Sequence, residues 1–222
     1  MRIVELTENT KKNLLKDLLK RSPSSYGTYE QTVSEIVNNV KENGDKAVFE
    51  YTEKFDHFAL NSGNIRVTEE EIKEAYKEIP EDLIEVYRHS AANIRTFHEK
   101  QLRQSFIETR PDGSILGQRI TPIEKAGVYV PGGKAAYPSS VLMNVVPAKV
   151  AGVPKIVMTT PCNKEGKVNA GTLVAADIAG VDEIYKVGGA QAIAALAFGT
   201  ESVPKVDKIT GPGNIFVALA KK

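Results

Sequence analysis

The feature that most constrains the fold is a fourfold alternation of short apolar runs, glycine-marked turns and alanine-rich segments after residue 126. The runs predicted as strands cover residues 127–130, 155–160, 183–187 and 205–209. The predicted helices cover residues 138–150, 169–179 and 190–198, and a last one begins after residue 214. Successive strand–loop–helix units are typical of a parallel sheet between two layers of helices. The sequence therefore predicts an α/β protein with an incomplete Rossmann-like parallel sheet and helices on both faces.

The chain changes character near residue 120. Residues 1–120 carry 39 charged side chains and 5 glycines, whereas residues 121–222 carry 18 and 12. A solvated helical part followed by closely packed strands and tight turns would produce this shift. We therefore expect a helical N-terminal portion over residues 1–128, with a short β-hairpin, and a Rossmann-like domain, a nucleotide-binding type of architecture, over residues 129–222.

Several local signals support the helical reading of the first part. Valine and isoleucine recur at helical spacing in residues 29–40, and an Asn-Gly-Asp break follows, whose Asp45 is expected to cap the next helix. Thr68 and Glu71 form a capping-box pattern before a further helix. A Pro-Asp-Gly triplet at 111–113 then favours a hairpin.

Composition excludes several classes of protein. The formal net charge is +1, 41% of residues are hydrophobic, and no run approaches the roughly 18 apolar residues of a membrane span. We therefore expect neither a nucleic-acid nor a membrane partner. The N-terminus is too charged for a secretory leader, and the single cysteine, Cys162, fits a reducing compartment. These features predict a cytoplasmic protein.

Three glycine-bearing loops follow predicted strands, at residues 131–133, 188–189 and 211–213. Ligands of open α/β sheets bind beyond the carboxyl ends of the strands, and glycines let a backbone approach phosphate closely. Tyr129, Gln191 and Asn214 lie beside these loops and can donate or accept specific hydrogen bonds. A dinucleotide is the natural candidate. The alternative is that the glycines serve only to make tight turns.

The standard dinucleotide fingerprint is missing. No G-x-G-x-x-G follows the first strand, and the second strand, KIVMTTPCN, lacks the acidic residue that holds an adenosine ribose. A P-loop pattern is missing as well. Any dinucleotide is therefore expected to bind in a nonstandard way.

Two long stretches, KAGVYVPGGKAAYPSSVLMNVVPAKVAGV and KVGGAQAIAALAFGTESVPKVDKITGPGN, resemble the signatures of histidinol dehydrogenase. The resemblance implies a zinc-dependent homodimer that oxidises L-histidinol through the aldehyde to L-histidine and reduces two NAD molecules. It also implies that the NAD contacts are Tyr129, Gln191 and Asn214. These are the residues that the glycine loops had already singled out.

The resemblance covers only part of the family's chain. Zinc ligands, substrate contacts and a catalytic Glu-His pair follow the GPGN segment in the family, whereas this sequence stops at IFVALAKK. We therefore expect an N-terminal half that is inactive alone and holds no catalytic or metal-binding residue. His89 and His98 are separated by a rotation of about 900° on one helix and cannot share a metal.

Two other functions stay open at this stage. The chain could be a non-catalytic dinucleotide-binding or interaction module that lacks the catalytic half. A weaker alternative is an NAD(P)-dependent aldehyde dehydrogenase, but no cysteine in a suitable catalytic setting supports it.

Overall fold

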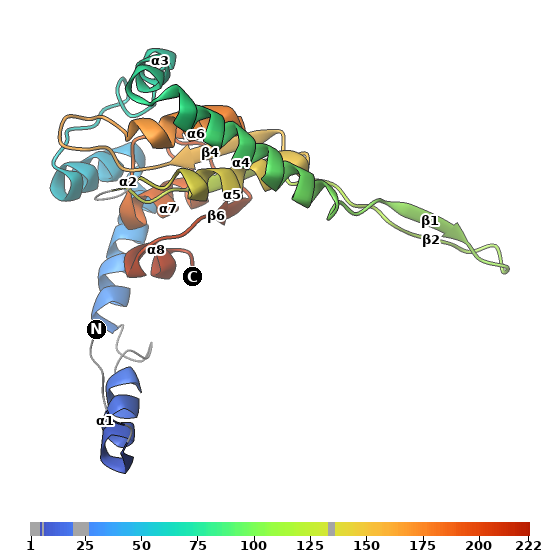
Figure 1. The fold of residues 1–222 in the computed structure, drawn as a ribbon, viewed down its shortest axis with the longest axis horizontal. Coiled ribbons are helices and arrows are strands. Elements are labelled where there is room, and N and C mark those ends of the chain that lie inside the picture. Colours follow the sequence, from blue (N-terminus) through green and yellow to red (C-terminus); the bar gives the residue numbers. More distant parts are fainter. Residues whose placement is uncertain (1–4, 6, 20–26, 133–135) are drawn as a thin grey trace.

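A computed structural model describes residues 5, 7–19, 27–132 and 136–222 of the chain, and Figure 1 shows its fold. The helices are α1 (Glu8–Leu19), α2 (Gly27–Asp56), α3 (Glu69–Glu78), α4 (Glu81–Glu99), α5 (Pro138–Val150), α6 (Ala170–Ala179), α7 (Gly189–Phe198) and α8 (Ile215–Ala220). The strands are β1 (Phe106–Thr109), β2 (Ile115–Gln118), β3 (Lys125–Tyr129), β4 (Lys155–Thr159), β5 (Glu183–Tyr185) and β6 (Lys208–Thr210). Within these residues, no helix is both long and apolar enough to cross a membrane.

The main sheet confirms the predicted Rossmann-like architecture. Its four strands are all parallel and lie in the order β5-β4-β3-β6. The chain moves outward from β3 through β4 to β5 and then returns to the other side of β3 with β6. The strand order therefore reverses at β3, where Tyr129 pairs with Thr159 of β4 and Val128 pairs with Thr210 of β6. In open α/β sheets, such a reversal marks the ligand-binding crevice.

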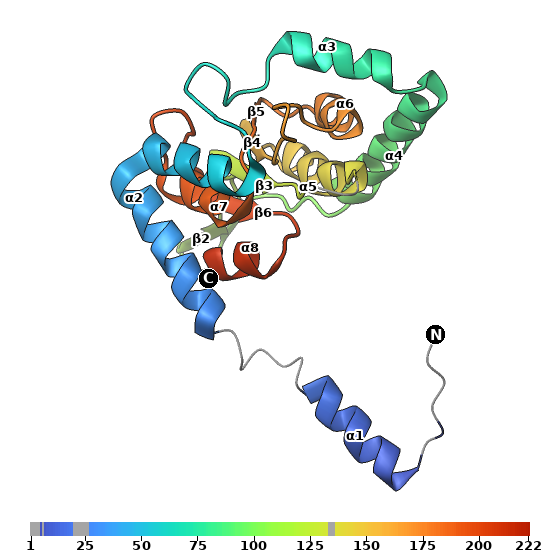
Figure 2. The same cartoon turned by 90° about the vertical axis from the view of Figure 1, so that its left-hand side faces the viewer.

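Helices cover both faces of this sheet, as Figure 2 shows. On one face lie α5 and α6, against which α4 and α3 pack; on the other lie α7 and α8, against which α2 packs. On each face, helices of the N-terminal portion therefore pack over the helices that cover the sheet. Residues from both parts of the sequence share the same two hydrophobic cores.

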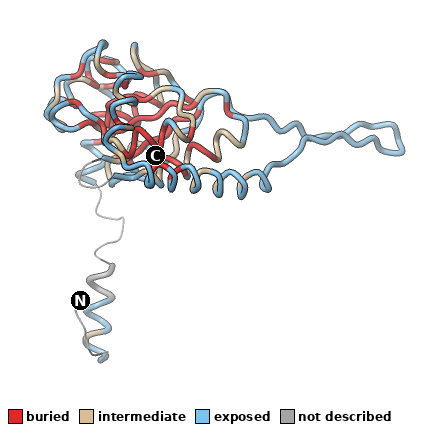
Figure 3. The backbone as a smooth tube through the Cα atoms, turned by 45° about the horizontal axis from the view of Figure 1, so that its top comes forward, coloured by how far each residue is buried: buried red, intermediate tan, exposed pale blue. Residues whose placement is uncertain are grey.

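The central strands β3 and β4 are largely buried because they contribute side chains to both cores. Val128 and Met158 enter the core beneath α5 and α6, whereas Tyr129 and Val157 enter the core beneath α7. This alternation follows from the period of two in a β-strand. Figure 3 shows the buried residues gathered in this region, while the hairpin of β1 and β2 projects away from it. The predicted hairpin is thereby confirmed.

Two strands are shorter in the structure than the sequence predicts. β5 stops at Tyr185 because the next residue, Lys186, directs its backbone N–H to Ile65 O at 2.8 Å, so the chain leaves the sheet. β6 begins only at Lys208 because Val206 N donates to Leu196 O at 2.9 Å. Tertiary hydrogen bonds to other segments therefore shorten both strands.

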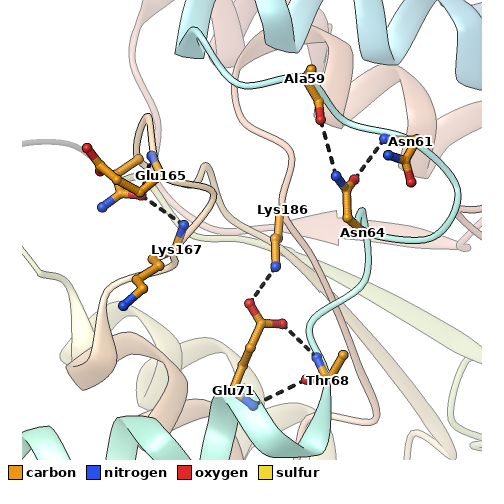
Figure 4. Close-up of polar contacts among 9 residues, drawn as sticks. Ala59, Asn61, Asn64, Thr68, Glu71, Glu165, Lys167 and Lys186 are labelled. Carbon is orange, nitrogen blue, oxygen red and sulfur yellow. Dashed lines mark hydrogen bonds and ion pairs between the residues drawn. The ribbon is translucent and has the colours of Figure 1, made fainter.

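The capping box that was predicted for α3 is present. Glu71 N donates to Thr68 Oγ1 at 3.2 Å, and Thr68 N donates to the Glu71 carboxylate at 2.9 Å. The other oxygen of Glu71 accepts a hydrogen bond from Lys186 Nζ, as Figure 4 shows. Only 6% of Lys186 is exposed. The capping carboxylate therefore also neutralises a buried lysine at the end of β5, which fixes α3 against the sheet.

The break predicted at residues 43–45 is a kink inside α2. Gly44 has φ 53° and ψ −132°, outside the helical region. The expected role of Asp45 as a helix cap is wrong, because its carboxylate accepts hydrogen bonds from Ser202 N at 3.2 Å and Ser202 Oγ at 2.5 Å. Asp45 N in turn donates to Glu201 Oε2 at 2.8 Å. These contacts bind the kink to the loop after α7.

Replacing Gly44 with alanine should destabilise the protein by about 1–3 kcal/mol, since its backbone conformation strongly disfavours a side chain. The added Cβ would also lie 2.4 Å from Glu201 Oε2, the oxygen that accepts from Asp45. Urea denaturation measures the change. Gly27→Ala is the matched control, because nothing lies within 4 Å of its Cβ position. Equal stability of the two variants would contradict this account of the kink.

Candidate functional site

A pocket of about 870 Å³ lies beyond the carboxyl end of β3, at the point where the strand order reverses. All three glycine-bearing loops contribute to it: Gly132 after β3, Gly188 and Gly189 at the start of α7, and Gly213 after β6. The second glycine of the first loop, Gly133, lies outside the described residues. The pocket has the size of a small-molecule site, and it brings together Tyr129, Gln191 and Asn214.

Tyr129 is the last residue of β3, and only 4% of it is exposed. Its hydroxyl oxygen accepts a hydrogen bond from Gly189 N at 3.2 Å. Burial raises the pKa of Tyr129 above its ordinary value, so the hydroxyl keeps its proton at neutral pH. The residue thus holds the start of α7 in place and still has one O–H that can donate to a ligand.

Gln191 lies in the first turn of α7 and is 1% exposed. Its Oε1 is fully buried and has no hydrogen-bond partner among the described residues. A Cβ on Gly189 would lie 2.6 Å from this oxygen, so the glycine provides the space that the amide occupies. An unsatisfied buried acceptor at a pocket wall is costly and favours a ligand that brings a donor.

Asn214 follows β6 and is the residue directly before α8. It therefore lies on the side of β3 that faces away from β4. Its Oδ1 accepts a hydrogen bond from Val217 N at 3.2 Å and so caps the helix. The residue is exposed at the rim of the pocket. Because the cap uses the carbonyl oxygen, the side-chain NH₂ is the group that can meet a ligand.

The glycines around the pocket are required for the close packing of its loops. A Cβ on Gly132 or Gly188 would lie 2.6 or 2.7 Å from Pro161, which follows β4. Gly211 has φ 108°, and its Cβ would lie 2.0 Å from Tyr129 O. The loops after β3, β5 and β6 therefore approach their neighbours more closely than a side chain permits.

Sequence reasoning did not identify Asp56, the last residue of α2, which also lines the pocket. Its Oδ2 is buried without a hydrogen-bond partner in the described part of the chain. Burial raises the pKa of Asp56 to about 6, and the charge of His57 opposes this shift. No local pattern separates Asp56 from the other acidic residues of α2, because its burial depends on where the kinked helix packs.

The histidines and Cys162 do not form a metal site in the residues that the structure describes, where no cluster of three or more potential ligands occurs. His89 and His98 both lie on α4, and His98 Nδ1 is 2.7 Å from Gln101 Oε1. Burial, with a smaller effect of the Asp56 charge, raises the pKa of Cys162 to about 11. Its thiol is therefore protonated at neutral pH and a poor nucleophile.

The parallel sheet and the pocket at its switch point define the class: a Rossmann-like α/β protein with a pocket of small-molecule size. A family model described as "Histidinol dehydrogenase" matches residues 19–222. The chain belongs to the histidinol dehydrogenase family, an oxidoreductase family of histidine biosynthesis.

Similar proteins give the same answer. The chain is 61% identical over 192 residues to histidinol dehydrogenase of Clostridium acetobutylicum. The aligned region covers 86% of this chain and 44% of that protein. It is 57% identical over 206 residues to the Bacillus subtilis protein, covering 92% and 48%. The crystal structure of histidinol dehydrogenase from Elizabethkingia anophelis superposes with a TM-score of 0.82 at 36% identity, covering 100% of this chain and 46% of that one. The chain thus spans about half the length of these relatives.

Replacing Asp56 with asparagine should stabilise the unliganded protein at neutral pH. The ordinary pKa of 3.8 is raised in the folded state, so burial of the charge begins to reduce stability above about pH 4 and does so fully above about pH 6. We expect the variant to melt about 2–4 °C higher at pH 7.5, roughly 1 kcal/mol once solvent screening of a partly exposed carboxyl is allowed for.

Thermal melts of both proteins at pH 4 and pH 7.5 test this expectation. The difference in Tm between variant and wild type should be much smaller at the lower pH, where the folded wild type carries a neutral carboxyl. Glu53→Gln, an exposed change of the same kind on α2, is the control. A pH-independent difference would contradict burial of a charged Asp56.

Proposed function

We propose that this chain provides the NAD-binding part of a histidinol dehydrogenase, which oxidises L-histidinol through L-histidinal to L-histidine. The observation that supports this most directly is the convergence of Tyr129, Gln191 and Asn214 on one pocket at the switch point of the sheet. The family supplies the reaction and the nature of the cofactor, and the pocket supplies a place for it.

The groups around the pocket suit a dinucleotide. Tyr129 offers an O–H donor, Gln191 offers an unsatisfied amide oxygen, and Asn214 offers an NH₂ group at the rim. Together they match the hydroxyl and amide groups of a nicotinamide dinucleotide. The glycine loops allow close approach of the backbone, which phosphate groups require.

In this proposal, the residues of this chain bind and orient the cofactor. NAD, when bound, accepts a hydride from the carbon that is oxidised. Tyr129 positions Gly189 and the start of α7 through its hydrogen bond, and the buried Gln191 limits the depth to which the cofactor enters. Fixing the cofactor in this way contributes to the rate by reducing the loss of orientational freedom at the reacting carbon.

Other parts of the proposed enzyme depend on residues beyond this set. The described residues contain no cluster that suits zinc, and we assign no step of the reaction to that metal. Binding of L-histidinol, assembly into a homodimer and a cytoplasmic setting belong to the proposal for the whole protein. Family membership, rather than the pocket, supports this part of the proposal.

Replacing Gln191 with methionine should weaken NAD binding about tenfold without loss of stability. Methionine keeps the volume of the side chain but cannot accept the hydrogen bond, and it removes an unsatisfied buried oxygen. Isothermal titration calorimetry measures the affinity, and thermal melting measures the stability. Gln118→Met, at an exposed position on β2, serves as the control. Unchanged affinity in Gln191→Met would count against the assignment.

The isolated chain should not oxidise L-histidinol, although it should bind NAD. The described residues contain no cluster of three or more metal-ligating side chains, and the chain spans about half of its relatives. Absorbance of NADH at saturating L-histidinol, NAD and zinc tests this expectation against a full-length family member. Turnover by the chain would overturn the expected inactivity. Failure to bind NAD would favour an interaction module over a cofactor-binding part.

A further inference from the structure

A standard Rossmann fold carries an acidic residue at the end of its second strand, where the carboxylate accepts hydrogen bonds from the adenosine ribose. The second strand of this sheet is β4, and the residues after it are Thr160, Pro161 and Cys162. None of them is acidic. If the pocket binds a dinucleotide, an acceptor for the ribose hydroxyls has to come from a different element.

Asp56 lies at this place although it belongs to α2. It lines the same pocket as Pro161 and Cys162, the two residues that follow the end of β4. The negative charge of Asp56 also contributes to raising the pKa of both Cys162 and Tyr129, which places it near the ends of β4 and β3. An acidic side chain from α2 therefore lies where the end of β4 supplies none.

The chain holds Asp56 in this position through the end of α2. His57 adopts a left-handed conformation with φ 59°, and its N–H donates to Glu53 O at 3.1 Å, which ends the helix. Phe58 then turns back into the hydrophobic core. The carboxylate of Asp56 is thereby directed toward the pocket rather than along the surface of the helix.

The carboxylate of Asp56 also lacks partners of its own. Its Oδ2 is fully buried without a hydrogen bond, and no lysine or arginine among the described residues forms an ion pair with it. A structural aspartate would normally be satisfied by a cap, a turn or a cation. Neighbouring hydroxyls on a ligand would satisfy both oxygens at once.

We propose that Asp56 binds the adenosine ribose of NAD, accepting hydrogen bonds from its hydroxyls, and that it selects NAD over NADP. A 2′-phosphate would remove the donor and place a second negative charge beside a carboxylate that is already poorly solvated. This inference rests on the proposed function. It adds a residue and a source of cofactor specificity to the site.

Calorimetric titration of the chain with three probes tests the proposal: NAD, NADP, and NAD that lacks the adenosine 2′-hydroxyl. Wild type should prefer NAD to both other probes. Asp56→Asn should bind NAD about tenfold more weakly, the loss expected for one charge-assisted hydrogen bond. The same variant should discriminate less against NADP and should no longer distinguish NAD from the deoxy probe. Glu53→Gln, an exposed change of equal charge one turn earlier, should behave as wild type.

The outcomes separate this inference from the proposed function. If wild type binds no NAD, the proposed function fails and the role of Asp56 fails with it. If wild type binds NAD but Asp56→Asn binds each of the three probes with the affinity of wild type, only the role of Asp56 is overturned. Loss of binding through unfolding is recognised by the melting temperature, which is expected to be higher than that of wild type at pH 7.5.

Discussion

The parallel pairing of β3 with β4 on one side and β6 on the other is the constraint on which the pocket depends. Because β4 and β6 lie on opposite sides of β3, the loops that follow β3 and β6 diverge and leave space beyond Tyr129. Gly211 keeps the loop after β6 close to this strand end, since its Cβ position lies only 2.0 Å from Tyr129 O. The same close approach brings Asn214 to the rim.

A second constraint comes from α2, which joins the helical portion to this site. Gly44 kinks the helix, and the contacts of Asp45 with Ser202 hold the kink against the loop after α7. α2 packs against α7 and α8, and its last residue, Asp56, reaches the pocket. One end of the site thus depends on a hydrogen-bonded contact between segments about 157 residues apart in sequence.

The sequence predicts the features that depend on neighbouring residues, and it does not predict those that depend on contacts between distant parts of the chain. Tyr129, Gln191 and Asn214 were identified because each lies beside a glycine loop that ends a strand, which is a local signal. Asp45 and Asp56 were misread or overlooked because their partners and burial come from elements far along the chain. Periodicity reports which face of a helix is apolar, but not which loop or pocket a kinked helix meets.

The two unsatisfied atoms at the pocket narrow the chemistry of its ligand. Gln191 Oε1 and Asp56 Oδ2 are both acceptors, so a ligand that satisfies them has to bring O–H or N–H donors. Phosphate oxygens bring none and would be repelled by the carboxylate, so they have to meet backbone N–H groups of the glycine loops. A dinucleotide carries both kinds of group on one molecule. This division explains how a Rossmann-like pocket without the usual glycine and acid fingerprint could still bind one.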